Sequence, residues 1–190
     1  INIRSDIDDA MTWLSKNPQV QQDRIGVIGF CFGGREALEL GRRFPDIAAM
    51  VSLYGGDMTT DSRDMGFLGD NGPVLAIYGE DDSRIPVELV KRFESAMNVA
   101  GIENTVSIYP GAGHAFVTPD TINASGAAQT AWTQIKDFFE ENLQTVPRIN
   151  LGHKGRLRLP VPDQLMRVHR PLLIPLPVLD RQILKIWCEV

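Results

Sequence analysis

The stretch 24-RIGVIGFCFGG-34 decides the fold, because an apolar run ends in a cysteine that is set between glycines. Residues 24–30 have the continuous apolar character of a strand that is buried on both faces of a parallel sheet. Cys31 follows this strand and is one of only two cysteines in the chain. A cysteine on an apolar strand is usually a small core residue, which needs no glycine neighbours. A nucleophile on a sharp strand-to-helix turn does need them, so the pattern indicates a reactive thiol.

The remaining elements alternate in the order of a parallel-sheet α/β fold. Strands are predicted as continuous apolar runs, and helices from apolar positions that recur every three or four residues. Residues 57–72 read as a polar loop. The predicted elements are a helix from Ser5 to Asn17, a strand at 24–30, a helix at 34–44, a strand at 47–55, a strand at 73–79, a helix at 86–101, a strand at 104–110 and a helix at 125–143. This alternation predicts helices packed on a parallel sheet.

The composition excludes several classes of function. A net charge of −5 and a pI near 5.2 argue against a nucleic-acid partner, since phosphate binding needs a basic face. No apolar run is long enough for a membrane span, and no signal peptide opens the chain. Two cysteines form no disulfide framework, so we expect a reducing cytoplasm. The three histidines lack metal-ligand spacing, and we expect no metal, no cofactor and a monomer or weak oligomer.

Charge and proline content change near Pro147. Up to that residue the chain holds 21 acidic and 11 basic residues, whereas residues 148–190 hold 3 and 8. Pro171, Pro175 and Pro177 interrupt the most apolar part of the second segment, where neither a helix nor a central strand fits. We therefore predict a domain over residues 1–147 and a basic, proline-rich tail, foreign to the fold of that domain, over residues 148–190.

Three chemically active groups follow three of the predicted strands. Cys31 follows the first strand, 79-GEDDSRIP-86 the third and 110-PGAGHAF-116 the fourth. The carboxyl ends of parallel strands share one edge of a sheet, so a thiol, a carboxylate and an imidazole are expected to meet there. They are the nucleophile, the base and the group that orients the base. By position alone, either Asp81 or Asp82 could supply the carboxylate.

These motifs carry a resemblance to a known family. The pentapeptide Gly29 to Gly33 is similar to the nucleophile elbow of α/β-hydrolases, and the order cysteine, acid, histidine is that of the same fold. Together with 54-YGG-56 and 111-GAGHAF-116, they make residues 1–145 resemble the dienelactone hydrolase family. The resemblance implies a parallel-sheet α/β-hydrolase fold that lacks its N-terminal strands.

The resemblance also implies the catalytic residues. The family pattern of glycine, two residues, aspartate and a proline four positions on fits Gly79, Asp82 and Pro86, whereas Asp81 stands one position early. The implied triad is therefore Cys31, Asp82 and His114. The backbone N–H of Phe32, at the start of a helix, is expected to donate to the oxyanion.

Aromatic residues near these motifs have two possible roles. Phe30, Tyr54 and Phe116 are candidates for substrate binding, and each could equally be a packing residue of the core. His114 and Asp82 also have ordinary alternatives, as a loop histidine and as the cap of the following helix.

The implied activity is hydrolysis of an ester or lactone of the dienelactone (carboxymethylenebutenolide) type, through a thioester on Cys31. No arginine closely follows His114, so a small-molecule ester or lactone is a safer expectation than the named substrate. The family places further strands before the nucleophile strand. We therefore expect the C-terminal half to two-thirds of a hydrolase, with one oxyanion donor missing and an open edge along residues 24–30. An alternative is that the tail rebuilds the lost strands, which its prolines disfavour. The alternative is a truncated, non-catalytic chain or a binding module.

Overall fold

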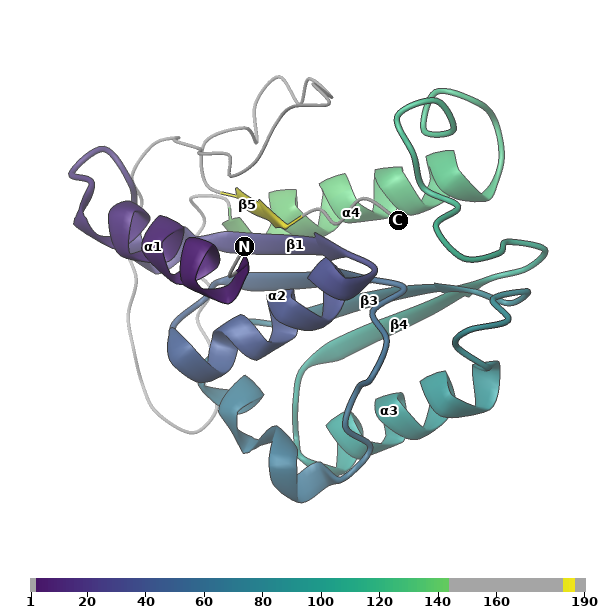
Figure 1. The fold of residues 1–190 in the computed structure, drawn as a ribbon, viewed down its shortest axis with the longest axis horizontal. Coiled ribbons are helices and arrows are strands. Elements are labelled where there is room, and N and C mark those ends of the chain that lie inside the picture. The colour runs from purple at the N-terminus through teal and green to yellow at the C-terminus, as the bar shows by residue number, and fades with distance from the viewer. Residues whose placement is uncertain (1–2, 144–182, 187–190) are drawn as a thin grey trace.

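A parallel sheet forms the centre of the protein in a computed structural model, which describes residues 3–143 and 183–186 (Figure 1). The sheet has the order β4-β3-β2-β1-β5, and all neighbouring pairs are parallel. Its strands are β1 (Gly26–Phe30), β2 (Ala49–Leu53), β3 (Val74–Gly79), β4 (Asn104–Tyr109) and β5 (Ile183–Ile186). The predicted parallel-sheet α/β architecture is confirmed.

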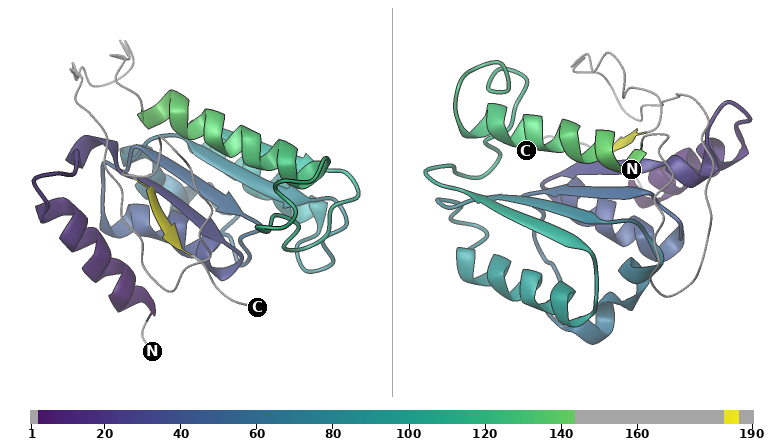
Figure 2. Two further views of the ribbon diagram at one scale, coloured as in Figure 1. Left: turned by 90° about the horizontal axis from the view of Figure 1, so that it is seen from above. Right: turned by 180° about the vertical axis from the view of Figure 1, so that it is seen from behind.

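Helices cover both faces of this sheet. Figures 1 and 2 show α4 on one face, and α2 and α3 on the other. Every residue of β1, β2 and β3 is consequently buried, whereas most of the edge strand β4 is only partly buried. The helices are α1 (Ile3–Lys16), α2 (Phe32–Arg43), α3 (Val87–Val99) and α4 (Ala127–Leu143). None of the helices described is long and apolar enough to cross a bilayer.

Two details differ from the sequence-based expectations. Helix α2 begins at Phe32 and so follows Cys31 directly, two residues earlier than predicted. The segment expected to be a polar loop contains a 3₁₀ helix at Ser62–Asp70, in which Met65 and Leu68 are buried. These two apolar side chains anchor the segment to the core, which explains why it takes a regular shape.

The open edge expected along the first strand is wrong, because β5 pairs with β1 from Gly26 to Gly29. Leu184 of β5 is buried against the core. The short apolar run of β5 follows the prolines of the tail and contains none itself, so nothing prevents its amides from pairing. The boundary at Pro147 and residues 148–182 lie outside the described residues, and the division of the chain there stays a prediction.

Two ion pairs join α1 to α2. The guanidinium of Arg4 donates to both carboxylate oxygens of Glu36, at 2.9 and 2.8 Å, and Arg43 donates to Asp8 at 2.7 Å. The side chain of Glu36 is fully buried, whereas that of Arg4 is about half exposed. A buried carboxylate needs a partner, so Arg4 fixes α1 beside the helix that follows Cys31.

We predict that Arg4→Ala lowers the melting temperature by several degrees, because it leaves the carboxylate of Glu36 buried without its partner. Arg63→Ala is the control, since it removes the comparable but exposed pair with Asp61 and should change little. Thermal unfolding followed by circular dichroism measures both variants. Equal shifts for the two would show that burial of Glu36 does not matter for stability.

Candidate active site

The thiol of Cys31 lies on a sharp turn between β1 and α2. The residue has φ 53° and ψ −120°, a left-handed backbone that is rare for residues other than glycine. Its N–H donates to the carbonyl of Leu53 at 3.0 Å, and its carbonyl accepts from the N–H of Gly34 at 2.9 Å. These bonds hold the strained turn between its neighbours, and the thiol is free and partly exposed.

The glycines of the turn allow two backbone segments to touch. A Cβ atom at Gly29 would lie 1.8 Å from the carbonyl oxygen of Gly33, and one at Gly34 would lie 2.8 Å from that of Leu53. Both carbonyls are held in place, because the first belongs to the turn itself and the second ends β2, where it accepts from the N–H of Cys31. The glycine spacing seen in the sequence is therefore a steric requirement of the turn.

Asp82 is the buried acid after β3. One of its carboxylate oxygens accepts from the backbone N–H groups of Arg84 at 2.9 Å and Ile85 at 3.2 Å. The other oxygen lies 2.7 Å from Nδ1 of His114. The neighbouring Asp81 is exposed, and its N–H donates to the carbonyl of Ala112 instead. Of the two candidate acids, the structure therefore places Asp82 against the imidazole.

His114 reaches back from the loop after β4. Its Nε2 lies 3.3 Å from Sγ of Cys31, while its Nδ1 faces Asp82. The loop turns sharply, with φ 68° at Gly111 and φ 58° at Ala115. The three predicted catalytic side chains thus form one continuous series of contacts.

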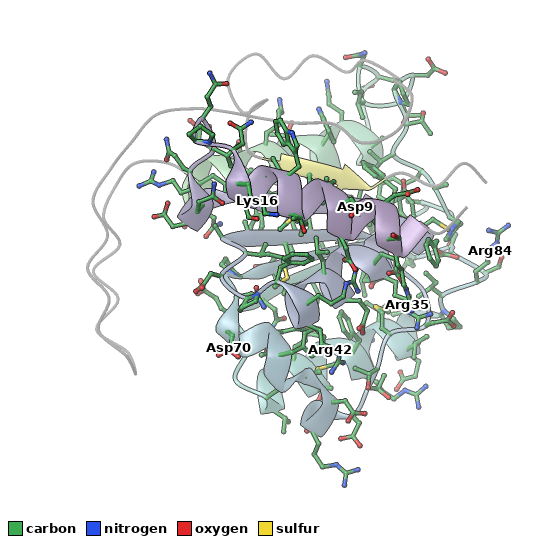
Figure 3. All side chains as sticks on the ribbon, turned by 60° about the vertical axis from the view of Figure 1, so that its left-hand side comes forward. Asp9, Lys16, Arg35, Arg42, Asp70 and Arg84 are labelled. Carbon is green, nitrogen blue, oxygen red and sulfur yellow. The ribbon has the colours of Figure 1, made fainter. Side chains whose placement is uncertain are left out.

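These groups meet at the carboxyl edge of the sheet. Figure 3 shows Arg35, near the start of α2, and Arg84, after β3, on one side of the molecule, with Lys16 and Asp70 on the other. Arg35 and Arg84 belong to segments that follow β1 and β3, so they mark the side of the molecule at which the carboxyl ends of the strands lie. The expectation that the motifs gather at one edge is confirmed.

Phe32 occupies the first position of α2. Its N–H has no acceptor among the residues described, as expected in the first turn of a helix. Phe32 is 37% exposed, and it is one of three large apolar residues that are exposed in the part of the chain that the structure describes. The free amide and the exposed side chain thus belong to the residue that follows Cys31 directly.

The three aromatic candidates for substrate binding lie at different depths. Phe30 and Tyr54 are buried, with 5% and 2% of their surfaces exposed, and Phe116 is partly buried. The ring of Tyr54 lies 5.2 Å from that of His114, 6.0 Å from Phe116 and 6.3 Å from Phe30, measured between centroids. Of these three, Phe116 has the most surface to offer a ligand.

Burial dominates the electrostatics of the tyrosines nearby. It raises the pKa of Tyr54 well above its ordinary value, and the charge of Cys31 adds to this effect. Burial likewise raises the pKa of Tyr78. Both phenols therefore keep their protons and act as hydrogen-bond donors. Within residues 3–143 and 183–186, no group of three or more histidine, cysteine or acidic side chains could hold a metal ion.

Sequence reasoning missed two sets of contacts. The amides of Arg84 and Ile85 orient Asp82, and they carry no side-chain signal that a sequence could reveal. The hydroxyl of Tyr54 donates to the carbonyl of Val117 at 3.2 Å, although the two residues lie 63 positions apart.

The geometry has counterparts among known proteins. The model of the dienelactone hydrolase family matches residues 2–143. The chain belongs to the dienelactone hydrolase family. A protein of Escherichia coli K12 named as a carboxymethylenebutenolidase is 31% identical over 148 residues, which are 73% of this chain and 54% of that protein. The chain thus spans about half the length of this curated relative.

Solved structures of the family share the fold. A structure assigned as a dienelactone hydrolase of Klebsiella pneumoniae has a TM-score of 0.59 and 27% identity, over 73% of this chain and 60% of that one. The dienelactone hydrolase-like promiscuous phosphotriesterase P91, from metagenomic libraries, has a TM-score of 0.61 and 26% identity, over 74% of this chain and 61% of that one. The predicted α/β-hydrolase fold is confirmed.

We predict that Gly29→Ala lowers the free energy of unfolding by about 3 kcal/mol or more, because its Cβ would overlap the carbonyl of Gly33. Gly66→Ala is the matched control, since nothing lies within 4 Å of a Cβ added there. Urea unfolding of both variants measures the difference. A Gly29→Ala protein as stable as Gly66→Ala would contradict the close approach within the turn.

Proposed function

We propose that the protein hydrolyses a carboxylic ester or lactone, with Cys31 as nucleophile, His114 as general base and Asp82 as the group that orients His114. The observation that carries the proposal is the series of contacts from carboxylate to imidazole to thiol, at 2.7 and 3.3 Å. Nucleophile, base and orienting acid in contact are the arrangement that activates a thiol.

The hydrogen bonds of Asp82 support one tautomer of His114. An ionised carboxylate can only accept, so Nδ1 carries the proton that is shared with Asp82. Nε2 is then the nitrogen with a free lone pair, and it is the one that faces Cys31. The base is therefore ready to receive the thiol proton.

Acylation begins when the thiol proton moves to Nε2 and Sγ attacks the carbonyl carbon of the substrate. The carbonyl oxygen becomes an oxyanion, to which the free N–H of Phe32 donates a hydrogen bond. As the carbon–oxygen single bond breaks, the leaving alkoxide takes the proton from His114. The product of this half-reaction is a thioester on Cys31 and a free alcohol, which stays attached in the case of a lactone.

Deacylation repeats these steps with water. His114 removes a proton from a water molecule, whose oxygen attacks the thioester carbonyl. When the carbon–sulfur bond breaks, the thiolate recovers the proton, and the carboxylic acid leaves. Every proton is returned, so the cycle needs neither metal nor cofactor.

The substrate class follows from the chemistry of the site, since a thiol and an oxyanion donor act on a carbonyl carbon. The named activities of the relatives, on butenolides and on phosphotriesters, make a small-molecule ester or lactone the best expectation. The exposed ring of Phe32 gives the substrate an apolar surface beside Cys31. We expect no other partner, and a monomer or weak oligomer in a reducing cytoplasm, where the thiol survives.

The proposal predicts a covalent intermediate on Cys31. After brief treatment with nitrophenyl acetate and acid quenching, intact mass spectrometry should show one added acetyl group, mapped to the peptide that contains Cys31. Cys31→Ala should carry none, whereas Cys188→Ala, which removes the other thiol of the chain, should acylate normally. Acyl transfer to Cys31→Ala would overturn the assignment, and no acylation of any variant would favour the non-catalytic alternative.

A second prediction ranks the two aspartates. Asp82→Asn should reduce turnover of nitrophenyl acetate on the order of a thousandfold or more, because the amide can favour the wrong tautomer of His114. Asp81→Asn, an exposed control of the same chemistry, should change turnover by much less. Steady-state release of nitrophenol measures both, and the opposite ranking would move the acid to Asp81.

A further inference from the structure

We infer that Tyr54 is a positioning residue that holds His114 against Cys31. The inference rests on the proposed triad and assigns a role to a side chain that takes no part in the proposed hydrolysis. Tyr54 contacts β1, β3 and the histidine loop, which carry the three groups of the proposed triad, although Tyr54 itself follows β2.

The backbone of Tyr54 lies between the nucleophile strand and the acid strand. It follows β2 directly, and the preceding carbonyl, that of Leu53, accepts from the N–H of Cys31. The N–H of Tyr54 donates to the carbonyl of Ile77 in β3 at 2.7 Å. Its φ of 38° is unusual for a bulky residue, and such strain persists only where the surroundings enforce it.

The ring of Tyr54 forms a surface against the imidazole of His114. The two rings lie 5.2 Å apart at an interplanar angle of 58°, a favourable tilted arrangement. Asp82 restrains His114 through its nitrogen, and Tyr54 restrains it through ring contact. The two restraints together limit rotation of the imidazole away from Cys31.

The hydroxyl of Tyr54 ties down the loop that carries the base. It donates to the carbonyl of Val117, three residues after His114. Burial keeps the pKa of Tyr54 high, so the phenol remains a donor across the working pH range. The loop between Gly111 and Ala115 has two left-handed residues, and this tether holds the end that follows them.

Small displacements of the base matter at this site. The hydrogen bond of 3.3 Å between Nε2 and Sγ depends on direction as well as distance, so rotation of the imidazole would break it. Tyr54 is only 2% exposed, so it has almost no surface for a substrate. A role in placing His114 therefore accounts for the contacts of Tyr54 better than substrate binding does.

The test follows the reactivity of Cys31 toward iodoacetamide as a function of pH, in the full chain carrying Cys188→Ala. His114 is the one titratable side chain, among the residues described, with a hydrogen bond to the Cys31 thiol. A thiolate alkylates much faster than a thiol, so a base that accepts the thiol proton should raise the rate of alkylation at pH 6, where a thiol without a base reacts slowly. Tyr54→Phe should slow alkylation at pH 6 by about ten- to a hundredfold and leave the rate at pH 9 unchanged.

Matched variants separate positioning from general packing. Tyr109→Phe removes another tyrosine hydroxyl, which bonds Gln134 rather than the histidine loop, and should leave the profile unchanged. Replacing Tyr54 by 4-aminophenylalanine keeps a donor for Val117 and should restore the profile, which also covers the case in which Tyr54→Phe folds poorly. An unchanged profile in Tyr54→Phe, or no recovery with the amino analogue, would overturn the inference.

His114→Ala distinguishes this inference from the proposed function. Loss of the base should abolish the reactivity at pH 6, whatever residue 54 is. If His114→Ala keeps the wild-type profile, the proposed triad itself is wrong. If His114→Ala changes the profile and Tyr54→Phe does not, the triad stands and only the role of Tyr54 is wrong.

Discussion

The close approach of Gly29 to the carbonyl of Gly33 is the constraint on which the site depends. It lets the chain leave β1 and enter α2 within one residue, which puts Cys31 in a left-handed conformation at the tip of the turn. A wider turn would change the directions in which the thiol and the free amide of Phe32 point. Both groups therefore depend on a contact in which no side chain takes part.

Sheet geometry explains why the histidine loop needs so much support. The three side chains of the proposed triad follow β1, β3 and β4. Neighbouring strands lie about 4.8 Å apart, and β1 and β4 are three positions apart in the sheet, so about 14 Å separate them. His114 must cross this distance to reach Cys31. The loop achieves this by folding over the end of β3. Gly79 allows the close approach, because a Cβ atom at this position would lie only 2.2 Å from the carbonyl oxygen of Ala112.

The sequence was sufficient for features that depend on residue type and spacing. The apolar runs predicted four of the strands. Position alone left Asp81 and Asp82 open, and only the resemblance to the family pattern from Gly79 to Pro86 picked out Asp82, the aspartate that faces His114. The sequence was insufficient where backbone groups or contacts between distant residues determine the structure. Examples are the amides that hold Asp82 and the burial of Tyr54. The pairing of β5 escaped prediction because the prolines before it dominate the local signal, and four residues are too few to predict a strand alone.

A gradient of exposure runs along the three side chains of the proposed triad. The side chain of Asp82 is fully buried, that of His114 is 14% exposed, and Phe32 beside the thiol is 37% exposed. Burial at the acid end makes its hydrogen bonds strong and fixed, since water cannot compete for them. Exposure at the thiol end leaves Sγ accessible to a ligand. On the proposed function, a substrate would therefore approach from the side of Cys31, while Asp82 stays shielded from water.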